Sequence, residues 1–305
     1  MKRSRKSIGA GAAAIRTRRP DADASRGRAK RRFGQHFLEP AWVEKLVHAI
    51  APDPSSVFLE IGPGRGAITR PLAASSAHVV AFEIDRDLAA LARGIPNVTV
   101  IEGNFLDIAP ETIVSALKDR GIQPGSDRTL RVAGNLPYNV ASPILFTLVD
   151  LFAAGVPLTD ATIMIQREVA DRMLASPGTK DYGVLAAVLG RWVRVERVLN
   201  LPPGAFRPAP KVHSSVLRLT FHAGWPPVVE ERVYRGLVQA VFTRRRKTLA
   251  NALLAYRASP ALTPRDALRA AGLDGSRRPE TLELEEFARL ADVYAAQGTP
   301  VQAHW

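Results

Sequence analysis

The sequence predicts an α/β fold, in which a mostly parallel sheet is closed by an antiparallel hairpin and followed by a small all-helical C-terminal domain. From residue 33 onward, apolar runs of strand length alternate with amphipathic stretches of helical length, a pattern typical of parallel sheets covered by helices on both faces. After Trp225 the strand signal ends, and the remaining chain has only helical patterns interrupted by prolines. The 305 residues, 46% of them hydrophobic, suffice for one domain of ordinary size and a smaller second one.

The individual elements follow from hydrophobic periodicity. A first helix is expected over residues 40–50, because its apolar side chains share one helical face: Trp42, Val43, Leu46, Val47 and Ile50. Five apolar runs bounded by Gly, Pro and Asp are the expected parallel strands: 57–61, 78–83, 97–102, 130–133 and 161–166. The amphipathic helices expected between them are 85–93, 111–119 and 142–152. No long helix separates the last two apolar runs, which are therefore expected to form the antiparallel hairpin: 192–199 and 214–221.

Composition excludes several classes of chemistry. The chain has no cysteine, which removes disulfides, thiolate metal sites and thiol-dependent reactions such as C5-cytosine methylation. Its histidines show no metal-ligand spacing, so no metal site is expected. No uninterrupted apolar run reaches the roughly 18 residues that would span a bilayer. We therefore expect a globular protein without a membrane partner.

The net charge of +13 is concentrated at the N-terminus. Residues 1–32 carry 12 Lys and Arg against Asp21 and Asp23, which leaves a charge of only +3 on the rest of the chain. This segment has no Val, Leu, Phe or Trp and is expected to be a disordered basic tail. A nucleic-acid-binding arm is the favoured interpretation. A solvated tail and an organellar transit peptide are alternatives, and arginines where a cleavage site would stand disfavour a secretory signal.

A glycine-rich turn and an acidic strand end indicate a nucleoside ligand. Residues 60–66, Glu-Ile-Gly-Pro-Gly-Arg-Gly, follow the first strand and open a helix, where a doubly wound sheet has its ligand crevice. The turn lacks both the GxGxxG pattern and a following Lys-Ser/Thr, which disfavours dinucleotide and P-loop sites. Glu83 ends the next strand and could accept both ribose hydroxyls. Together they suit S-adenosylmethionine; a plain tight turn and a strand-end acid are the structural alternatives.

Residues 135–138, Asn-Leu-Pro-Tyr, are expected beside that crevice, at the carboxyl end of the fourth strand. The N6 amine of adenine is a poor nucleophile, because its lone pair is delocalised into the ring. Hydrogen bonds from the amine to the Asn135 side-chain oxygen and the Leu136 carbonyl would pull it toward tetrahedral geometry, while Tyr138 stacks on the base. Catalysis would then rest on positioning and dipoles rather than on a general base. A turn with a surface tyrosine is the alternative.

Seven motifs occur in the order typical of ribosomal RNA adenine dimethyltransferases. They are residues 33–38, 60–64, 83–85, 135–139, 180–183, 206–212 and 245–251. From about Phe33 to about Leu290 the chain most closely resembles the small-subunit (16S) enzymes of the KsgA/RsmA family. The resemblance implies a Rossmann-like class I methyltransferase domain over residues 33–225, a helical rRNA-recognition domain over residues 226–305, and S-adenosylmethionine as methyl donor. It further implies a monomeric cytoplasmic enzyme that dimethylates N6 of two adjacent adenines near the 3′ end of 16S rRNA during small-subunit biogenesis.

The resemblance also implies a cofactor site. His36 and Leu38 would contact the methionine part of the cofactor, Gly62 would pass beneath it, and Glu83 would hold the ribose. Gly64 would also belong to the cofactor site. Two positions depart from the family pattern. Asn104 stands where an Asp normally faces the cofactor adenine, and His36 stands where Asn is common.

For the target adenine, the resemblance implies that Asn135 also lies against the cofactor and contacts the amine with Leu136, and that Tyr138 and Phe206 stack on the base. Phe206 could instead be a buried anchor in its proline-rich loop. A run of four basic residues opens a helix and would contact the RNA backbone, with a solvated helix face as the alternative: Arg244, Arg245, Arg246 and Lys247.

Two competing functions remain open. A macrolide-resistance methyltransferase acting on 23S rRNA would share the cofactor site, but residues 135–139 and the later motifs resemble the small-subunit enzymes. An rRNA-binding assembly or transcription factor could keep the fold without turnover. The presence of Asn135, Tyr138 and the glycine turn argues against that second alternative.

Overall fold

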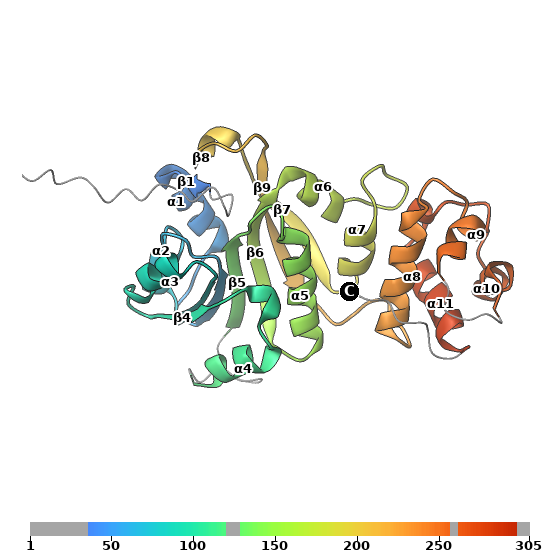
Figure 1. The fold of residues 1–305 in the computed structure, drawn as a ribbon, viewed down its shortest axis with the longest axis horizontal. Helices are drawn as coiled ribbons and strands as arrows, with labels where there is room; N and C mark the ends of the chain where they lie inside the picture. The colour runs from blue at the N-terminus through green and yellow to red at the C-terminus, as the bar shows by residue number, and fades with distance from the viewer. Residues whose placement is uncertain (1–35, 120–128, 257–261, 298–305) are drawn as a thin grey trace, which may run out of the picture.

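The structure is a computed structural model that describes residues 36–119, 129–256 and 262–297 (Figure 1). The predicted basic tail, residues 1–32, lies outside the described residues. The described chain forms a seven-stranded sheet beside a group of helices. In sheet order the strands are β4 (Val98–Glu102), β3 (His78–Glu83), β2 (Ser56–Ile61), β5 (Thr129–Asn135), β6 (Leu158–Gln166), β9 (Ser214–Phe221) and β7 (Val193–Leu201).

The sheet confirms the predicted fold class. The five strands from β4 to β6 are parallel, and β9 runs antiparallel between β6 and β7. Each expected strand is present, because strands buried on both faces are nearly continuous apolar runs. The expected hairpin is present as the β7–β9 pair, with a long proline-rich connection in place of a tight turn.

Helices cover both faces of the sheet. On one face α1 (Pro40–Ile50) and α2 (Thr69–Ser75) pack on Phe58 of β2, whereas its neighbours Val57 and Leu59 point to the other face, as the two-residue period of a strand requires. The other face carries α4 (Pro110–Lys118), α5 (Ala141–Ala153) and α6 (Arg167–Met173). Helix α3 (Arg86–Arg93) begins at Asp85, whose side chain accepts from the first turn.

A two-stranded ladder was not predicted from the sequence. Strand β1 (Phe37–Leu38) pairs antiparallel with β8 (Phe206–Arg207), so that Leu38 lies opposite Phe206. Strands of two residues are too short to show a hydrophobic period, and these two are far apart in the chain. The ladder brings the start of the described chain against the proline-rich connection.

The C-terminal helices form a second hydrophobic core. They are α8 (Glu231–Thr243), α9 (Leu249–Ala252), α10 (Pro264–Ala271) and α11 (Leu284–Ala295). Helix α7 (Val184–Leu189) lies between the two cores, because Ala187 and Val188 pack with the C-terminal helices while Leu189 packs with the sheet. Within the described ranges, no helix has the length and apolar character needed to cross a bilayer.

A buried ion pair joins the sheet to α8. The side chain of Arg191 is 2% exposed, and its Nη1 donates to Oε2 of Glu231 at 2.5 Å. Its Nε donates to the carbonyl of Pro226 at 2.9 Å, and its guanidinium lies 4.4 Å from the ring centre of Tyr234. A buried charge is tolerated only when it is paired and hydrogen-bonded, and Arg191 meets both conditions.

Candidate functional site

The glycine turn leaves open space above the end of β2. Gly62 has φ +71°, a conformation that L side chains rarely adopt, and no atom lies within 4 Å of the position that a Cβ would take. Gly66 is different: a Cβ there would lie 2.7 Å from Ile95. Gly62 therefore forms an open cradle for a ligand, whereas Gly66 is required by packing.

Glu83 lies beside this turn because β2 and β3 are parallel neighbours that end together. The N–H of Gly64 donates to Oε2 of Glu83 at 3.0 Å, and the N–H of Asp85 donates to Oε1 at 3.0 Å. Each carboxylate oxygen can accept a further hydrogen bond. The expected ribose acceptor is thus held in a fixed orientation at the cradle, 5% exposed.

Ile84 is a residue of this site that was not predicted from the sequence. It follows Glu83 directly, and 53% of it is exposed, which is unusual for a large apolar side chain. The N–H of Gly103 donates to the carbonyl of Glu83, so the loop that carries Asn104 runs alongside. An exposed apolar side chain here fits the flat face of a purine. The signal in the sequence was an isoleucine between two acids, Glu83 and Asp85.

Asn104 is held by its own loop. Its Oδ1 accepts from the N–H of Leu106 at 3.3 Å, capping a short 3-10 helix (Phe105–Asp107), and its Nδ2 donates to Oδ2 of Asp107 at 2.9 Å. A second hydrogen bond to Oδ1 remains available, since an amide oxygen accepts two. Contact with a cofactor adenine therefore stays a prediction.

Glu60, in the strand below the turn, is completely buried. Its Oε2 has no hydrogen-bond partner in the part of the chain that the structure describes. Burial raises the pKa of Glu60 to about 8, the hydroxyl of Thr69 opposes part of the rise, and the negative charge of Glu83 adds to it. The Glu60 side chain is therefore neutral over most of the physiological range.

The Asn-Leu-Pro-Tyr segment meets the start of the described chain. Asn135 ends β5, and its Nδ2 donates to the carbonyl of His36 at 3.4 Å. The rings of His36 and Tyr138 stack with centroids 6.0 Å apart and planes at 24°. The phenol of Tyr138 lies 2.7 Å from the hydroxyl of Ser214. The fold thus brings together three predicted site residues, His36, Asn135 and Tyr138, at the start of β9. Ser214, the partner of Tyr138, was not predicted from the sequence.

Two further hydrogen bonds hold this cluster in place. Nδ1 of His36 donates to the carbonyl of Pro208 at 2.7 Å, because a carbonyl can only accept. The N–H of Leu136 donates to the carbonyl of Met164 at 3.0 Å, which anchors the segment to β6. Burial raises the pKa of Tyr138 above its usual range despite the hydrogen bond with Ser214. The Tyr138 ring is therefore a neutral, half-buried platform.

The expected stacking role of Phe206 is wrong for this structure. Phe206 is 1% exposed and packs with Leu46 and Ile50 under α1. Its pairing with Leu38 directs the side chain into the core, so Phe206 supports the β1–β8 ladder from below. The alternative of a buried anchor in the proline-rich loop is the correct one.

The basic run does not open a helix as predicted. Residues 244–247 form the turn between α8 and α9, and α9 begins only at Leu249. The reason is tertiary: the N–H of Leu249 donates to the carbonyl of Arg277, and that of Ala250 donates to Gly275. A distant loop thus satisfies the first amides of α9 and fixes where it starts.

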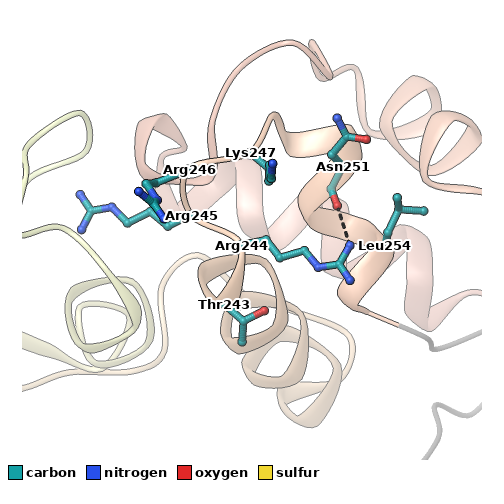
Figure 2. A pocket seen from close by; sticks show the side chains of 7 residues that line it. All are labelled: Thr243, Arg244, Arg245, Arg246, Lys247, Asn251 and Leu254. Carbon is teal, nitrogen blue, oxygen red and sulfur yellow. Dashed lines mark hydrogen bonds between the residues drawn. The ribbon is translucent and has the colours of Figure 1, made fainter.

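This turn lines a cavity of about 570 Å³ (Figure 2). Arg244 reaches across it and donates to the carbonyl of Asn251 at 3.4 Å, near the half-exposed Leu254. Arg245 is engaged elsewhere, since its Nη2 donates to the carbonyl of Thr179 at 3.1 Å and its Nε lies 3.8 Å from Glu280. Arg244 and Arg245 therefore bond to other parts of the protein, whereas Arg246 and Lys247 are exposed to solvent.

Comparisons with known proteins identify the family that this chain resembles. A family model described as ribosomal RNA adenine dimethylase matches residues 26–295. A ribosomal RNA small subunit methyltransferase A from Pseudomonas fluorescens is 40% identical over 279 residues, covering 90% of this chain and 96% of the relative. One from Koribacter versatilis is 39% identical over 272 residues, covering 86% and 93%.

Two solved structures share the fold. A dimethyladenosine transferase from Plasmodium falciparum superposes with a TM-score of 0.68 at 23% identity, covering 87% of this chain and 99% of that one. The 23S rRNA methyltransferase ErmE superposes with a TM-score of 0.57 at 26% identity, covering 85% and 99%. The described sheet and the C-terminal helices thus have counterparts in both solved structures.

Proposed function

The chain belongs to the ribosomal RNA adenine dimethylase family and uses S-adenosylmethionine, and we propose that it dimethylates N6 of two adjacent adenines near the 3′ end of 16S rRNA. The family, the enzyme class and the methyl donor expected from the sequence are confirmed. The small-subunit substrate is supported by relatives of about 40% identity that are named small-subunit methyltransferases.

The residues around the glycine turn fit the donor. Open space above Gly62, the fixed carboxylate of Glu83 and the exposed face of Ile84 offer a cradle, a hydroxyl acceptor and an apolar surface. We propose that these residues hold the donor together with His36, Leu38, Gly64, Asn104 and Asn135. When bound, S-adenosylmethionine supplies a methyl group on a sulfonium, which a weak nucleophile can attack.

The orientation of Asn135 carries the proposed chemistry. Because its Nδ2 donates to the carbonyl of His36, its Oδ1 faces away from β1 and has no partner among the described residues. Oδ1 can therefore accept a hydrogen bond from the adenine amine, with the carbonyl of Leu136 as second acceptor. Tyr138 offers its ring face to the base, and the proton leaves after transfer, so none of these side chains needs to act as a base beforehand.

The proposal extends to the setting of the reaction. The rRNA is presented by the small ribosomal subunit or its precursor, and the enzyme acts as a cytoplasmic monomer. We propose that the C-terminal helices recognise this rRNA and that residues 33–225 form the catalytic domain. The basic turn and the +10 charge of residues 1–32 support an RNA partner through counterion release.

Methylation of purified subunits tests the proposal. Undermethylated small subunits and 23S-containing large subunits are each incubated with labelled donor, and their rRNA is digested and analysed by mass spectrometry. We expect dimethyladenosine at two adjacent positions of 16S rRNA only. Label in 23S rRNA would favour the alternative that the likeness to ErmE allows, and binding of subunits without transfer would favour the non-enzymatic alternative.

A further inference from the structure

A second surface feature lies beside the glycine turn and is lined in part by Arg65 and Gly66. It is a groove of about 710 Å³ between α1, the turn and the start of α2. Its apolar wall is formed by Leu38, Pro40, Val43, Val47, Ala67 and Pro71. Its polar groups are Glu44, His48, Arg65 and Arg70. We call it the α1–α2 groove.

The groove begins next to the target site. Leu38 lines it and belongs to β1, and the preceding His36 stacks on Tyr138. In Figure 1, α1 and α2 lie at the end of the molecule away from α8–α11, and β1 and β8 lie beside α1 at that same end. A polymer that enters the site from the basic turn of the C-terminal helices would leave it toward α1 and α2.

The chemistry of the groove matches a single RNA strand. Arg65 and Arg70 are both exposed, and the guanidinium of Arg65 lies over the ring of Phe37 at 4.4 Å. Their two guanidinium groups outweigh the single carboxylate of Glu44. The cationic side chains can bind phosphates, and the aliphatic wall can cover the faces of unpaired bases, although it lacks the aromatic rings that many single-strand-binding proteins use.

We propose that the α1–α2 groove binds a single-stranded segment of the rRNA next to the target adenines, with bases against Val43 and Val47 and phosphates on Arg65 and Arg70. This inference rests on the proposed rRNA substrate. The chain's own N-terminal segment is the other candidate occupant, because it joins β1 at His36. Its +10 charge disfavours that occupant, since like charges would meet at Arg65 and Arg70.

The first test measures the salt dependence of binding to undermethylated small subunits. Arg70→Ala should lower the slope of log affinity against log salt by about 0.7, and Arg65→Ala/Arg70→Ala by about 1.4. The matched control is Arg93→Ala/Arg194→Ala, which removes two exposed arginines outside both the groove and the C-terminal helices and should leave the slope unchanged. Calorimetric titration with S-adenosylhomocysteine should give equal affinity in all variants, which shows that the glycine turn is intact. An unchanged slope in the double variant overturns the proposal.

The second test locates the RNA directly, and the absence of cysteine makes it specific. Val47→Cys and the control Leu91→Cys, 58% exposed on α3, are labelled with benzophenone maleimide and irradiated with the same subunits. We expect crosslinks from position 47 to rRNA near the modified adenines, and far fewer from position 91. If position 47 instead crosslinks to residues 1–35 of its own chain, and deletion of residues 1–32 abolishes the product, the groove holds that segment and the proposal is wrong. Methylation of the subunits by the parent protein reports separately on the proposed function.

Discussion

The side-chain amide of Asn104 donates a hydrogen bond to the carboxylate of Asp107. This pairing needs a neutral donor at position 104, where the family pattern has an acid. An aspartate there would lose the donor and set two negative charges against each other. The departure from the family pattern at position 104 thus fits the acid that stands three residues later.

We expect Asn104→Asp to weaken binding of S-adenosylhomocysteine, by less than about tenfold because Asp107 is exposed and its charge is screened. Adding Asp107→Asn should restore the affinity. Asn104→Leu removes both the cap and the acceptor and should weaken binding more. Isothermal titration of the four proteins measures this, and equal affinity of Asn104→Leu and the parent would show that residue 104 does not contact the ligand.

Removal of the amide at the proposed reacting centre should affect turnover rather than binding. Asn135→Ala loses the Oδ1 acceptor, and we expect methyl transfer to fall by ~10² or more with little change in affinity for S-adenosylhomocysteine. Asn139→Ala, four residues further in the same exposed loop, is the control and should keep most activity. Turnover of Asn135→Ala at the parent's rate would rule out the proposed role.

The buried Glu60 predicts a loss of stability with rising pH. Its pKa is about 8 in the folded protein and near 4.5 when unfolded, so between these values the unfolded state releases a proton that the folded state keeps. The free energy of unfolding therefore decreases by roughly 1.4 kcal/mol per pH unit across this window and levels off above pH 8. Glu60→Gln cannot ionise, so its stability relative to the parent should rise from pH 5 to pH 8. Urea unfolding at several pH values checks this, and a constant difference contradicts it.

Substitutions in the basic turn should separate a residue that stabilises the fold from residues that bind RNA. Arg245→Ala removes the hydrogen bond to Thr179 and the ion pair with Glu280, and it should cost about 1 kcal/mol of folding stability. Arg246 and Lys247 are exposed and reach no acceptor among the described residues, so Arg246→Ala/Lys247→Ala should leave stability within about 0.5 kcal/mol. The same double variant should lower the salt slope of subunit binding by about 1.4 to 1.8. Thermal unfolding and binding titrations distinguish the two effects.

The N-terminal charge makes a separate prediction. If residues 1–32 bind phosphates, their deletion should reduce the salt slope by about 0.7 to 0.9 for each phosphate that they neutralise, without changing affinity for S-adenosylhomocysteine. A variant in which the Lys and Arg of residues 1–32 are replaced by Gln keeps the length of the segment and removes its positive charge, so it shows whether the charge alone causes the change in slope. A slope equal to the parent's would leave the segment as a solvated tail.

Much of the fold was predictable because buried parallel strands and amphipathic helices have strong periods. The order of strands then brought Gly62, Glu83 and Asn135 to one edge of the sheet. What could not be predicted depends on contacts between distant segments. Phe206 has the same proline-rich neighbours whether it is buried or exposed, and only its pairing with Leu38 decides. The start of α9 likewise depends on carbonyls of a loop more than twenty residues away.

Helix α7 belongs to both hydrophobic cores, with Val188 packed on one side and Leu189 on the other. The C-terminal helices, which carry the basic turn, are therefore joined to the sheet, which carries Asn135, through packed apolar side chains of one helix. If the basic turn binds the rRNA as proposed, the number of nucleotides between that contact and Asn135 determines which adenine is methylated. Base substitutions between the nucleotides at the basic turn and the target adenine should then be tolerated. Insertion or deletion of one nucleotide in that stretch should bring a different base to Asn135.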